Sequence, residues 1–462
     1  MNAKSTFETP EFLEKIYSQK LSIGSAIGGL AAATGTSCNL VGLAISSILG
    51  GLAGPTAFVE GPLGEPLHPG FNLIIADNDP NWHQLQRVVL GAVESLQRQL
   101  REIGQISTED SITRKPFEDG NRNLGKEIRE CFDKHMDQAS PVAAILDHAR
   151  PGLALRLPSM VMNSPTPESF AAGIEEILDR EVAVYYPHGG LFQEIAKLSP
   201  SRRWHQFLGQ LVQALEGSDA SFQPICENSG FGSLSMLRAR LLMTCNASHI
   251  RVALASNNSD VQRFLHQCLI IRPKRWSAAP SIRPLELKGV YSSYASAVKN
   301  VMANRRCGQS AQLTVDAAGY DILSQYSDFL RAKAASIDLP GHPWIIMDLH
   351  WKLMWSMKVL YPRAADIAAA AIAVHLGHCA INEHLALVSE ERQMHETQAA
   401  EKARKIMLSK LRELGDVTVR DLLRTYNNQR KDLHLPVLEG LIQQGLINQT
   451  GNIICLADTT KP

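Results

Sequence analysis

The basic residues towards the end of the chain have the type and the spacing that bind phosphate. Proteins hold duplex DNA mainly by placing lysine and arginine against its phosphates, so a segment rich in these residues is a candidate nucleic-acid surface. The residues concerned are Lys402, Arg404, Lys405, Lys410, Arg412, Arg420, Arg424, Arg430 and Lys431. We expect the last four of them to contact DNA.

The same segment gives weaker evidence for contacts to the DNA bases than for contacts to phosphates. Gln443 and Gln444 fall on exposed positions of a predicted helix, and glutamine can pair with adenine in a major groove. Glu439 and Gly440 lie on the same surface and weaken this evidence, because a helix that reads DNA usually carries basic residues there. The alternative, in which this part of the chain docks a protein or is purely structural, stays open.

One predicted helix is rich in histidine and is therefore a candidate metal site. His375 and His378 are one turn apart, which suits a metal ion, and Cys379 and His384 lie on the same helix. A zinc site of Cys and His usually takes further ligands from a second segment, and none is evident. Packing is the better interpretation, so we expect no metal and no other cofactor. No hydrolase motif such as Gly-x-Ser-x-Gly occurs, and we assign no catalytic residue.

Composition indicates a folded, multi-domain protein. The 462 residues are 45% hydrophobic and 20% charged, with 46 basic and 46 acidic side chains, so any nucleic-acid binding must be local. The eight cysteines are scattered without a Cys-x-x-Cys pair, which favours a reducing, cytoplasmic location. Between Lys20 and Glu60 there is no charge, but the many small and polar residues there predict two buried helices, at 23–34 and 40–49, rather than a membrane span.

The elements that must position these residues form four predicted regions. Helices at 1–60 pack on an α/β core at 61–290, where apolar runs such as Phe71–Ala76 and Glu181–Tyr186 alternate with helical segments and predict a mostly parallel sheet. Region 291–395 is predicted to be helical, with an exposed linker helix at 390–405.

Residues 396–462 have the order of a winged helix-turn-helix. A helix that stops at Gly415, a second helix from Val419 and a third that opens at Pro436 and ends at Gly445 precede a hairpin with Thr450-Gly451-Asn452 at its tip.

In order and spacing, the chain resembles the primase-associated, RecA-like helicase family of phages, plasmids and integrative mobile elements, from about Ser22 onwards. The shared units are paired helices, a proline–strand–loop–helix unit at Pro69–Leu100, a Pro-Thr-Pro-Glu-Ser-Phe helix start at Pro165–Phe170, and a C-terminal winged helix. The resemblance implies an ATP-hydrolysing core that moves along or opens DNA. It also implies a P-loop in the first loop and acidic magnesium ligands after the strand at Glu181–Tyr186.

The chain departs from that family at both of these positions. A P-loop needs glycine N–H groups, a lysine and a hydroxyl, and residues 76–83 contain none of the three. The degenerate site would instead hold Asp77, Asp79, Trp82 and His83, whose two carboxylates would repel a triphosphate. His188 lies where the family has an acidic pair.

Two polar residues match further positions of the family. The resemblance implies that Asn246 senses the γ-phosphate and that Arg263 reaches nucleotide or a neighbouring subunit. Without a P-loop, a strand-end turn residue and a surface ion pair are the better interpretations.

The expected protein is therefore a pseudo-ATPase: an α/β RecA-like core with a degenerate P-loop, a helical region and a C-terminal winged helix-turn-helix. We expect it to bind DNA and recruit a protein partner, or to form a homo-oligomer, for a mobile element, with no membrane association. An active helicase-type ATPase with an atypical nucleotide site and a scaffold without DNA binding stay open.

Overall fold

The computed structural model of the protein describes residues 8–10, 12, 25–76, 85–95, 161–163, 165–166, 170, 181–186, 191, 194, 202–216, 238–256, 258–272, 284–306, 312–334, 343–424 and 431–457. The chain divides into two compact units, Met1–Val388 and Ser389–Pro462. Helix α15 (Asp366–Leu414) supplies residues to both units.

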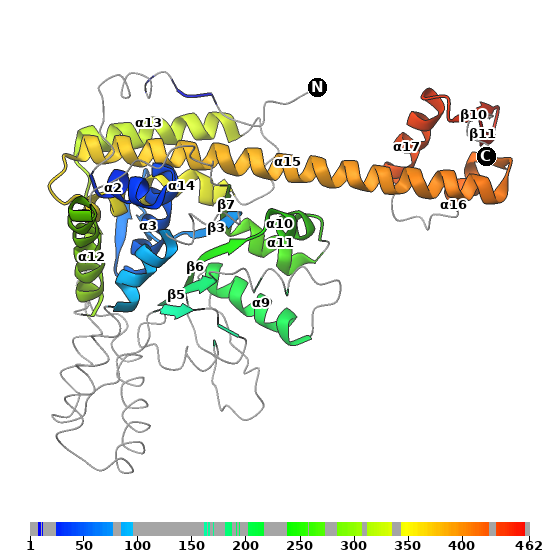
Figure 1. The fold of residues 1–462 in the computed structure, drawn as a ribbon. Helices are drawn as coiled ribbons and strands as arrows, with labels where there is room; N and C mark the ends of the chain where they lie inside the picture. Colours follow the sequence, from blue (N-terminus) through cyan, green and yellow to red (C-terminus); the bar gives the residue numbers. More distant parts are fainter. Residues whose placement is uncertain are drawn as a thin grey trace, which may run out of the picture. The chain divides into compact units, whose positions relative to one another are not determined.

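The first unit is mixed α/β and contains a five-stranded sheet in which every neighbouring pair of strands is parallel (Figure 1). The strand order is β4-β5-β6-β3-β7. The strands are β3 (Asn72–Ala76), β4 (Val161–Asn163), β5 (Glu181–Tyr186), β6 (Arg238–Cys245) and β7 (Cys268–Ile271). The prediction of a parallel sheet between helices is confirmed.

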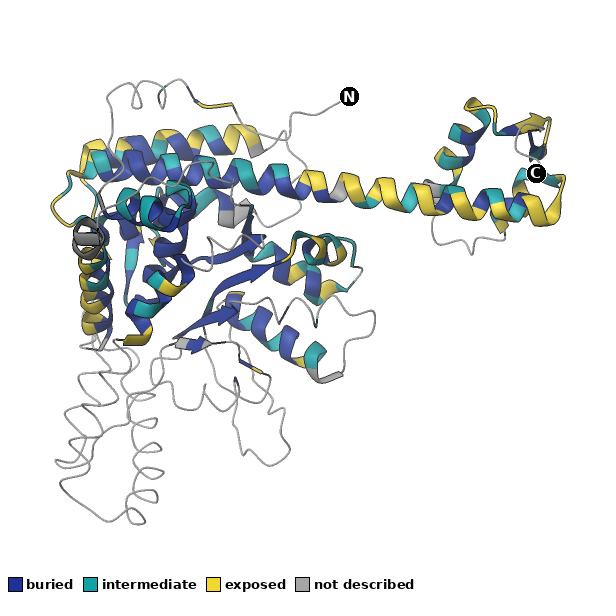
Figure 2. Ribbon diagram, in the orientation of Figure 1, coloured by how far each residue is buried: buried dark blue, intermediate teal, exposed yellow. Residues whose placement is uncertain are grey.

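Burial on both faces explains why these apolar runs form a parallel sheet. Every residue of β3 and β7 is buried, as is typical of strands covered by helices on each side. Alternate residues of a strand enter different cores: Leu73 and Ile75 pack in one hydrophobic cluster, and Ile74 and Ala76 pack in another. The sheet is thus the middle layer of the unit, and its strands are buried almost throughout (Figure 2).

The two helical layers come from different parts of the chain. The hydrophobic cluster on one face of the sheet contains residues of α2 (Ser25–Thr34), α3 (Cys38–Leu52), α12 (Pro284–Arg306), α13 (Ala317–Ala334), α14 (Pro343–Leu360), the first part of α15 and the helical residues 85–95. The other face packs against α9 (Arg202–Glu216), α10 (Ala247–Leu254) and α11 (Ser259–His266). A second, small sheet of order β2-β1-β8 is formed by β1 (Phe58–Glu60), β2 (Pro66–Leu67) and β8 (Gln312–Leu313).

The uncharged segment forms the two buried helices that its composition predicts. The hydroxyl of Ser37 accepts a hydrogen bond from the Leu40 N–H at 3.2 Å and caps α3. A Cβ at Gly50 would lie 2.6 Å from the Pro69 carbonyl oxygen, so the small residue lets α3 touch the backbone that leads into β3. Among the described residues no single helix is long and apolar enough to cross a membrane; α2 and α3 pass that test only as a pair, which is bent by 115°.

The second unit combines the end of α15, α16 (Val419–Arg424) and α17 (Lys431–Gln443) with an antiparallel sheet of order β10-β11-β9. The strands are β9 (Val417–Thr418), β10 (Ile447–Thr450) and β11 (Ile453–Leu456). The core of the unit is formed by Met407, Leu411, Leu422, Leu438, Leu441, Ile447, Ile454 and Leu456. The predicted succession of three helices and a hairpin is present, and β9 adds a strand that the sequence pattern does not predict.

Turn chemistry accounts for where these elements end. Gly445 has φ +68°, its N–H donates to the Ile442 carbonyl, and the Leu446 N–H donates to the Leu441 carbonyl, which together make a Schellman motif after α17. At the start of α16, the Thr418 hydroxyl accepts a hydrogen bond from the Asp421 N–H at 3.1 Å.

Two boundaries differ from the prediction. Helix α17 begins at Lys431, not at Pro436, which lies inside the helix, so one helical hydrogen bond is missing there. The last part of the predicted helical region 291–395, the linker helix at 390–405 and the helix that stops at Gly415 are all parts of α15, because no proline or glycine cap interrupts them.

Candidate functional site

The carboxyl ends of three central strands meet at one edge of the parallel sheet. Ala76, the last residue of β3, pairs with Cys245, the last residue of β6, and Tyr186, the last residue of β5, pairs with Met243. Strand β6 therefore lies between β3 and β5, and the loops that follow the three strands leave from the same edge. The loop residues Asp77, Asp79, Trp82, His83 and His188 lie outside the described residues.

The connections from this edge diverge between β3 and β6. The chain after β3 continues to the helical residues 85–95, whose buried side chains join the core on one face of the sheet. The chain after β6 continues to α10 and α11, which cover the opposite face. In parallel sheets, ligands bind outside the carboxyl ends of the strands where neighbouring connections diverge in this way. The candidate ligand site of the first unit is therefore the edge beside Ala76 and Cys245.

Asn246 stands at this edge as the N-cap of α10. Its side-chain oxygen accepts a hydrogen bond from the Ser248 N–H at 3.0 Å, and the residue is exposed. Because Asn246 follows Cys245, it lies next to the point where the chain leaves β3. The contact that Asn246 makes is that of an ordinary helix cap.

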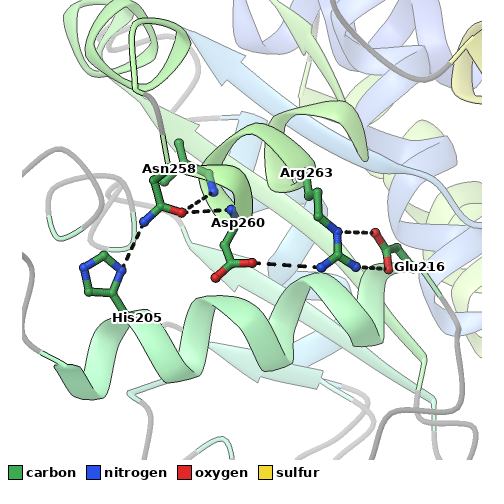
Figure 3. A network of polar contacts seen from close by, with 6 residues as sticks. His205, Glu216, Asn258, Asp260 and Arg263 are labelled. Carbon is green, nitrogen blue, oxygen red and sulfur yellow. Dashed lines mark hydrogen bonds and ion pairs between the residues drawn. The ribbon is translucent and has the colours of Figure 1, made fainter.

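Arg263 lies elsewhere, on the last turn of α11, which leads into the amino end of β7. Its guanidinium donates to both carboxylate oxygens of Glu216, at 2.6 and 3.3 Å, and is 3.9 Å from Asp260 (Figure 3). The Arg263 side chain is 47% exposed, so the pair contributes little to stability despite its good geometry. The described contacts thus pair Arg263 with the end of α9 and do not bring it to Asn246.

A second polar contact in Figure 3 joins the beginnings of the same two helices. Asn258 caps α11 by accepting from the Asp260 and Val261 N–H groups, and its side-chain nitrogen is 3.2 Å from Nδ1 of His205 on α9. The network from His205 to Glu216 therefore holds α9 and α11 side by side. Sequence patterns indicate the Asn258 cap but not its partner, because His205 is remote in the chain.

The strand ends at the candidate edge carry neutral, buried side chains. The Tyr186 hydroxyl donates to the Pro165 carbonyl at 2.6 Å, and burial raises the pKa of this phenol well above its usual range. Burial also raises the pKa of the Cys245 thiol, so it stays protonated at neutral pH. Neither side chain supplies a carboxylate, which is the group that usually holds magnesium in proteins.

His378 and His384 of α15 are buried in the protein. His378 lies 3.2 Å from the Tyr326 hydroxyl and 3.1 Å from the Asn382 amide nitrogen, and the Cys379 thiol lies 3.8 Å from Nε2 of His375. Burial lowers the pKa of His378 to about 4, and the charge of His375 adds to that effect. Within the described part of the chain, no three His, Cys, Asp or Glu side chains are grouped as metal ligands.

Sequence reasoning misses a buried polar cluster between α13 and α14. His350 Nε2 is 2.9 Å from the Ser327 hydroxyl, which also accepts a hydrogen bond from the Trp351 indole at 3.0 Å. Burial lowers the pKa of His350 to about 3. The imidazole is fully enclosed, so the cluster stabilises helix packing and is not open to a ligand.

In the second unit, four of the six predicted DNA-binding residues are described, and all four are exposed. Arg420 and Arg424 are exposed on α16, and Arg424 lies 3.7 Å from Asp421. Gln443 and Gln444 are exposed at the end of α17. Arg430 lies outside the described residues, and the side chain of Lys431 is not described.

Comparisons with models of known protein families and with curated proteins find no match for this chain. The family resemblance rests on the order and spacing of the elements alone.

Proposed function

We propose that the protein is a catalytically inactive, helicase-like DNA-binding protein of a mobile genetic element, which recruits a partner for replication, maintenance or transposition. In this proposal the first unit is a RecA-like core with a degenerate P-loop, and the second unit is a winged helix-turn-helix. The parallel sheet, with its diverging connections between β3 and β6, is compatible with such a core.

The observation that carries the DNA-binding proposal is the order of elements in the second unit. Three helices followed by a hairpin, packed on one small core, are the arrangement in which winged helix domains present basic residues to DNA. Arg420 and Arg424 are exposed on its second helix.

Loss of nucleotide chemistry is supported at two positions of the candidate edge. Residues 76–83 lack the glycine, lysine and hydroxyl of a P-loop, and β5 ends in the buried phenol of Tyr186. We therefore expect no thermal shift with magnesium-ATP and no ATP turnover. A ligand that binds only the native state at a hundred times its dissociation constant adds about 2.7 kcal/mol of stability, so a shift of that order would contradict the pseudo-ATPase proposal and favour an active ATPase.

DNA binding is tested by its salt dependence. Replacing Arg420, Arg424, Arg430 and Lys431 by alanine should weaken binding of duplex DNA and lower the log–log salt slope by roughly 0.9 for each phosphate that the protein no longer neutralises. The fold should be retained, because the core is made by residues such as Leu422 and Leu438. An unchanged affinity and slope would mean that these four residues do not contact DNA.

One observation favours a second candidate function, protein docking. Leu435 on α17 is 46% exposed and Glu439 is exposed beyond it, a combination that suits a protein surface better than a phosphate backbone. Wild-type protein that fails to shift duplex DNA at low salt would favour this function.

A further inference from the structure

The exposed charges of the second unit are unevenly divided among its elements. From His434 to Gln444 the chain has no lysine or arginine, and from Leu446 to Ala457 it has no charged residue. The only charged side chain described on α17 is Glu439, which is exposed. A helix that enters a DNA groove passes between phosphates, which repel a carboxylate, and the segment from His434 to Gln444 has no lysine or arginine that would compensate.

The end of α15 carries the opposite kind of surface. Ala403, Met407 and Leu411 are buried on its inner side, whereas Lys402, Lys405 and Arg412 are exposed. At 100° per residue, these three cations fall within about 80° of one another, on the side of the helix opposite Met407. We call Lys402, Lys405 and Arg412 the α15 basic stripe.

The stripe residues are available to a ligand. Lys410 is paired with Glu413 at 3.0 Å and Arg424 with Asp421 at 3.7 Å. By contrast, within the described part of the second unit none of the three stripe residues makes an ion pair or a hydrogen bond. Glu401 lies at the margin of the stripe and leaves it with a net positive charge.

The length of the stripe fits a phosphate backbone. At 1.5 Å per residue, Lys402 and Arg412 are about 15 Å apart along α15. Duplex DNA carries one phosphate charge per about 1.7 Å of its axis when both strands are counted, so three cations spread over this length can each meet a phosphate. We infer that the second unit binds the phosphate backbone of duplex DNA through the α15 basic stripe, with α17 outside the groove. This inference rests on the proposed DNA-binding function and names the surface that performs it.

The test is fluorescence anisotropy of a labelled DNA duplex with the full chain at several salt concentrations. The stripe variant carries Lys402→Gln, Lys405→Gln and Arg412→Gln, and should lose affinity with a slope lower by about 2.7, which is three phosphates at about 0.9 each. A charge-retaining variant with Lys402→Arg, Lys405→Arg and Arg412→Lys should keep the wild-type slope. The latter also shows that substitution at these exposed positions leaves the fold intact.

Two further variants separate the explanations. A matched control with Arg87→Gln, Lys299→Gln and Arg363→Gln removes three exposed cations from the first unit and should bind like wild type. The variant Gln443→Ala, Gln444→Ala should also bind like wild type, because α17 is not inserted.

The outcomes distinguish this inference from the function on which it rests. If the glutamine pair is essential while the stripe variant binds normally, or if the matched control loses as much affinity as the stripe variant, the stripe is overturned and DNA binding stands. If wild-type protein does not bind duplex DNA at low salt, the DNA-binding function fails and the stripe fails with it.

Discussion

The contact between His384 and strand β7 makes the stability of the first unit depend on pH. The Ile270 N–H donates to Nδ1 of His384 at 3.0 Å, which ties α15 to the edge strand of the sheet. An imidazole that accepts through Nδ1 must be neutral at that nitrogen. Burial lowers the pKa of His384 to about 4, although the Ile270 carbonyl oxygen, which lies 3.2 Å from the same nitrogen, favours the protonated imidazole and works in the opposite direction.

The sign and the size of the effect follow from this pKa. The unfolded chain binds a proton at His384 near pH 6.5, and the folded protein does so only near pH 4, so between these values the unfolded state binds more protons. The stabilisation is complete above pH 6.5 and is lost as the pH falls towards 4. From pH 7 to pH 5, His384 alone should lower the free energy of unfolding by about 2 kcal/mol.

The substitution His384→Gln isolates this contribution, because its amide oxygen can accept from the Ile270 N–H and does not titrate. Urea unfolding can be followed by tryptophan fluorescence, since all six tryptophans lie in the first unit. The wild type should lose about 2 kcal/mol more than the variant between pH 7 and pH 5. Equal losses in the two proteins would refute the reasoning that His384 is held neutral against β7.

Three further substitutions test how the elements are held. Gly445→Ala should destabilise the second unit by about 1–2 kcal/mol, because φ is +68° at this position. Gly440→Ala lies in the preceding helix with open space around its Cβ and should stabilise the unit by about 0.5–1 kcal/mol. Calorimetry that gave stability changes of the same sign for the two variants would contradict this reasoning. Gly50→Ala should cost the first unit about 1–3 kcal/mol by forcing α3 from the Pro69 carbonyl, in contrast to the unobstructed Gly91→Ala, as measured by urea unfolding. Asn258→Ala should cost about 1 kcal/mol through loss of the α11 cap, and Asn258→Asp, which can still cap, should cost less in the same measurement.

Local sequence patterns determined most of the secondary structure. Strand β5 occupies the predicted residues Glu181–Tyr186, because an apolar β-rich run bounded by turn residues has few alternatives. The cap at Thr418 and the Schellman glycine Gly445 were predictable for the same reason, since both signals act within a few residues of the helix end. The sequence pattern divides α15 into shorter helices, because its residues change from apolar to charged, but no proline or glycine cap interrupts the helix there.

Only the tertiary structure decided which side chains meet. The order of the parallel strands places Asn246 beside the end of β3, although the two are far apart in the chain. The packing of α11 on α9 pairs Arg263 with Glu216, and no local spacing in the sequence could predict this partner. His384 contacts β7 because α15 passes that edge of the sheet. In another fold, histidines one turn apart on a helix could bind a metal ion instead. The spacing of apolar residues along one or two turns is enough to show which side of a helix is buried. The partner of each side chain depends instead on segments that are distant in the sequence and that come together only when the chain folds.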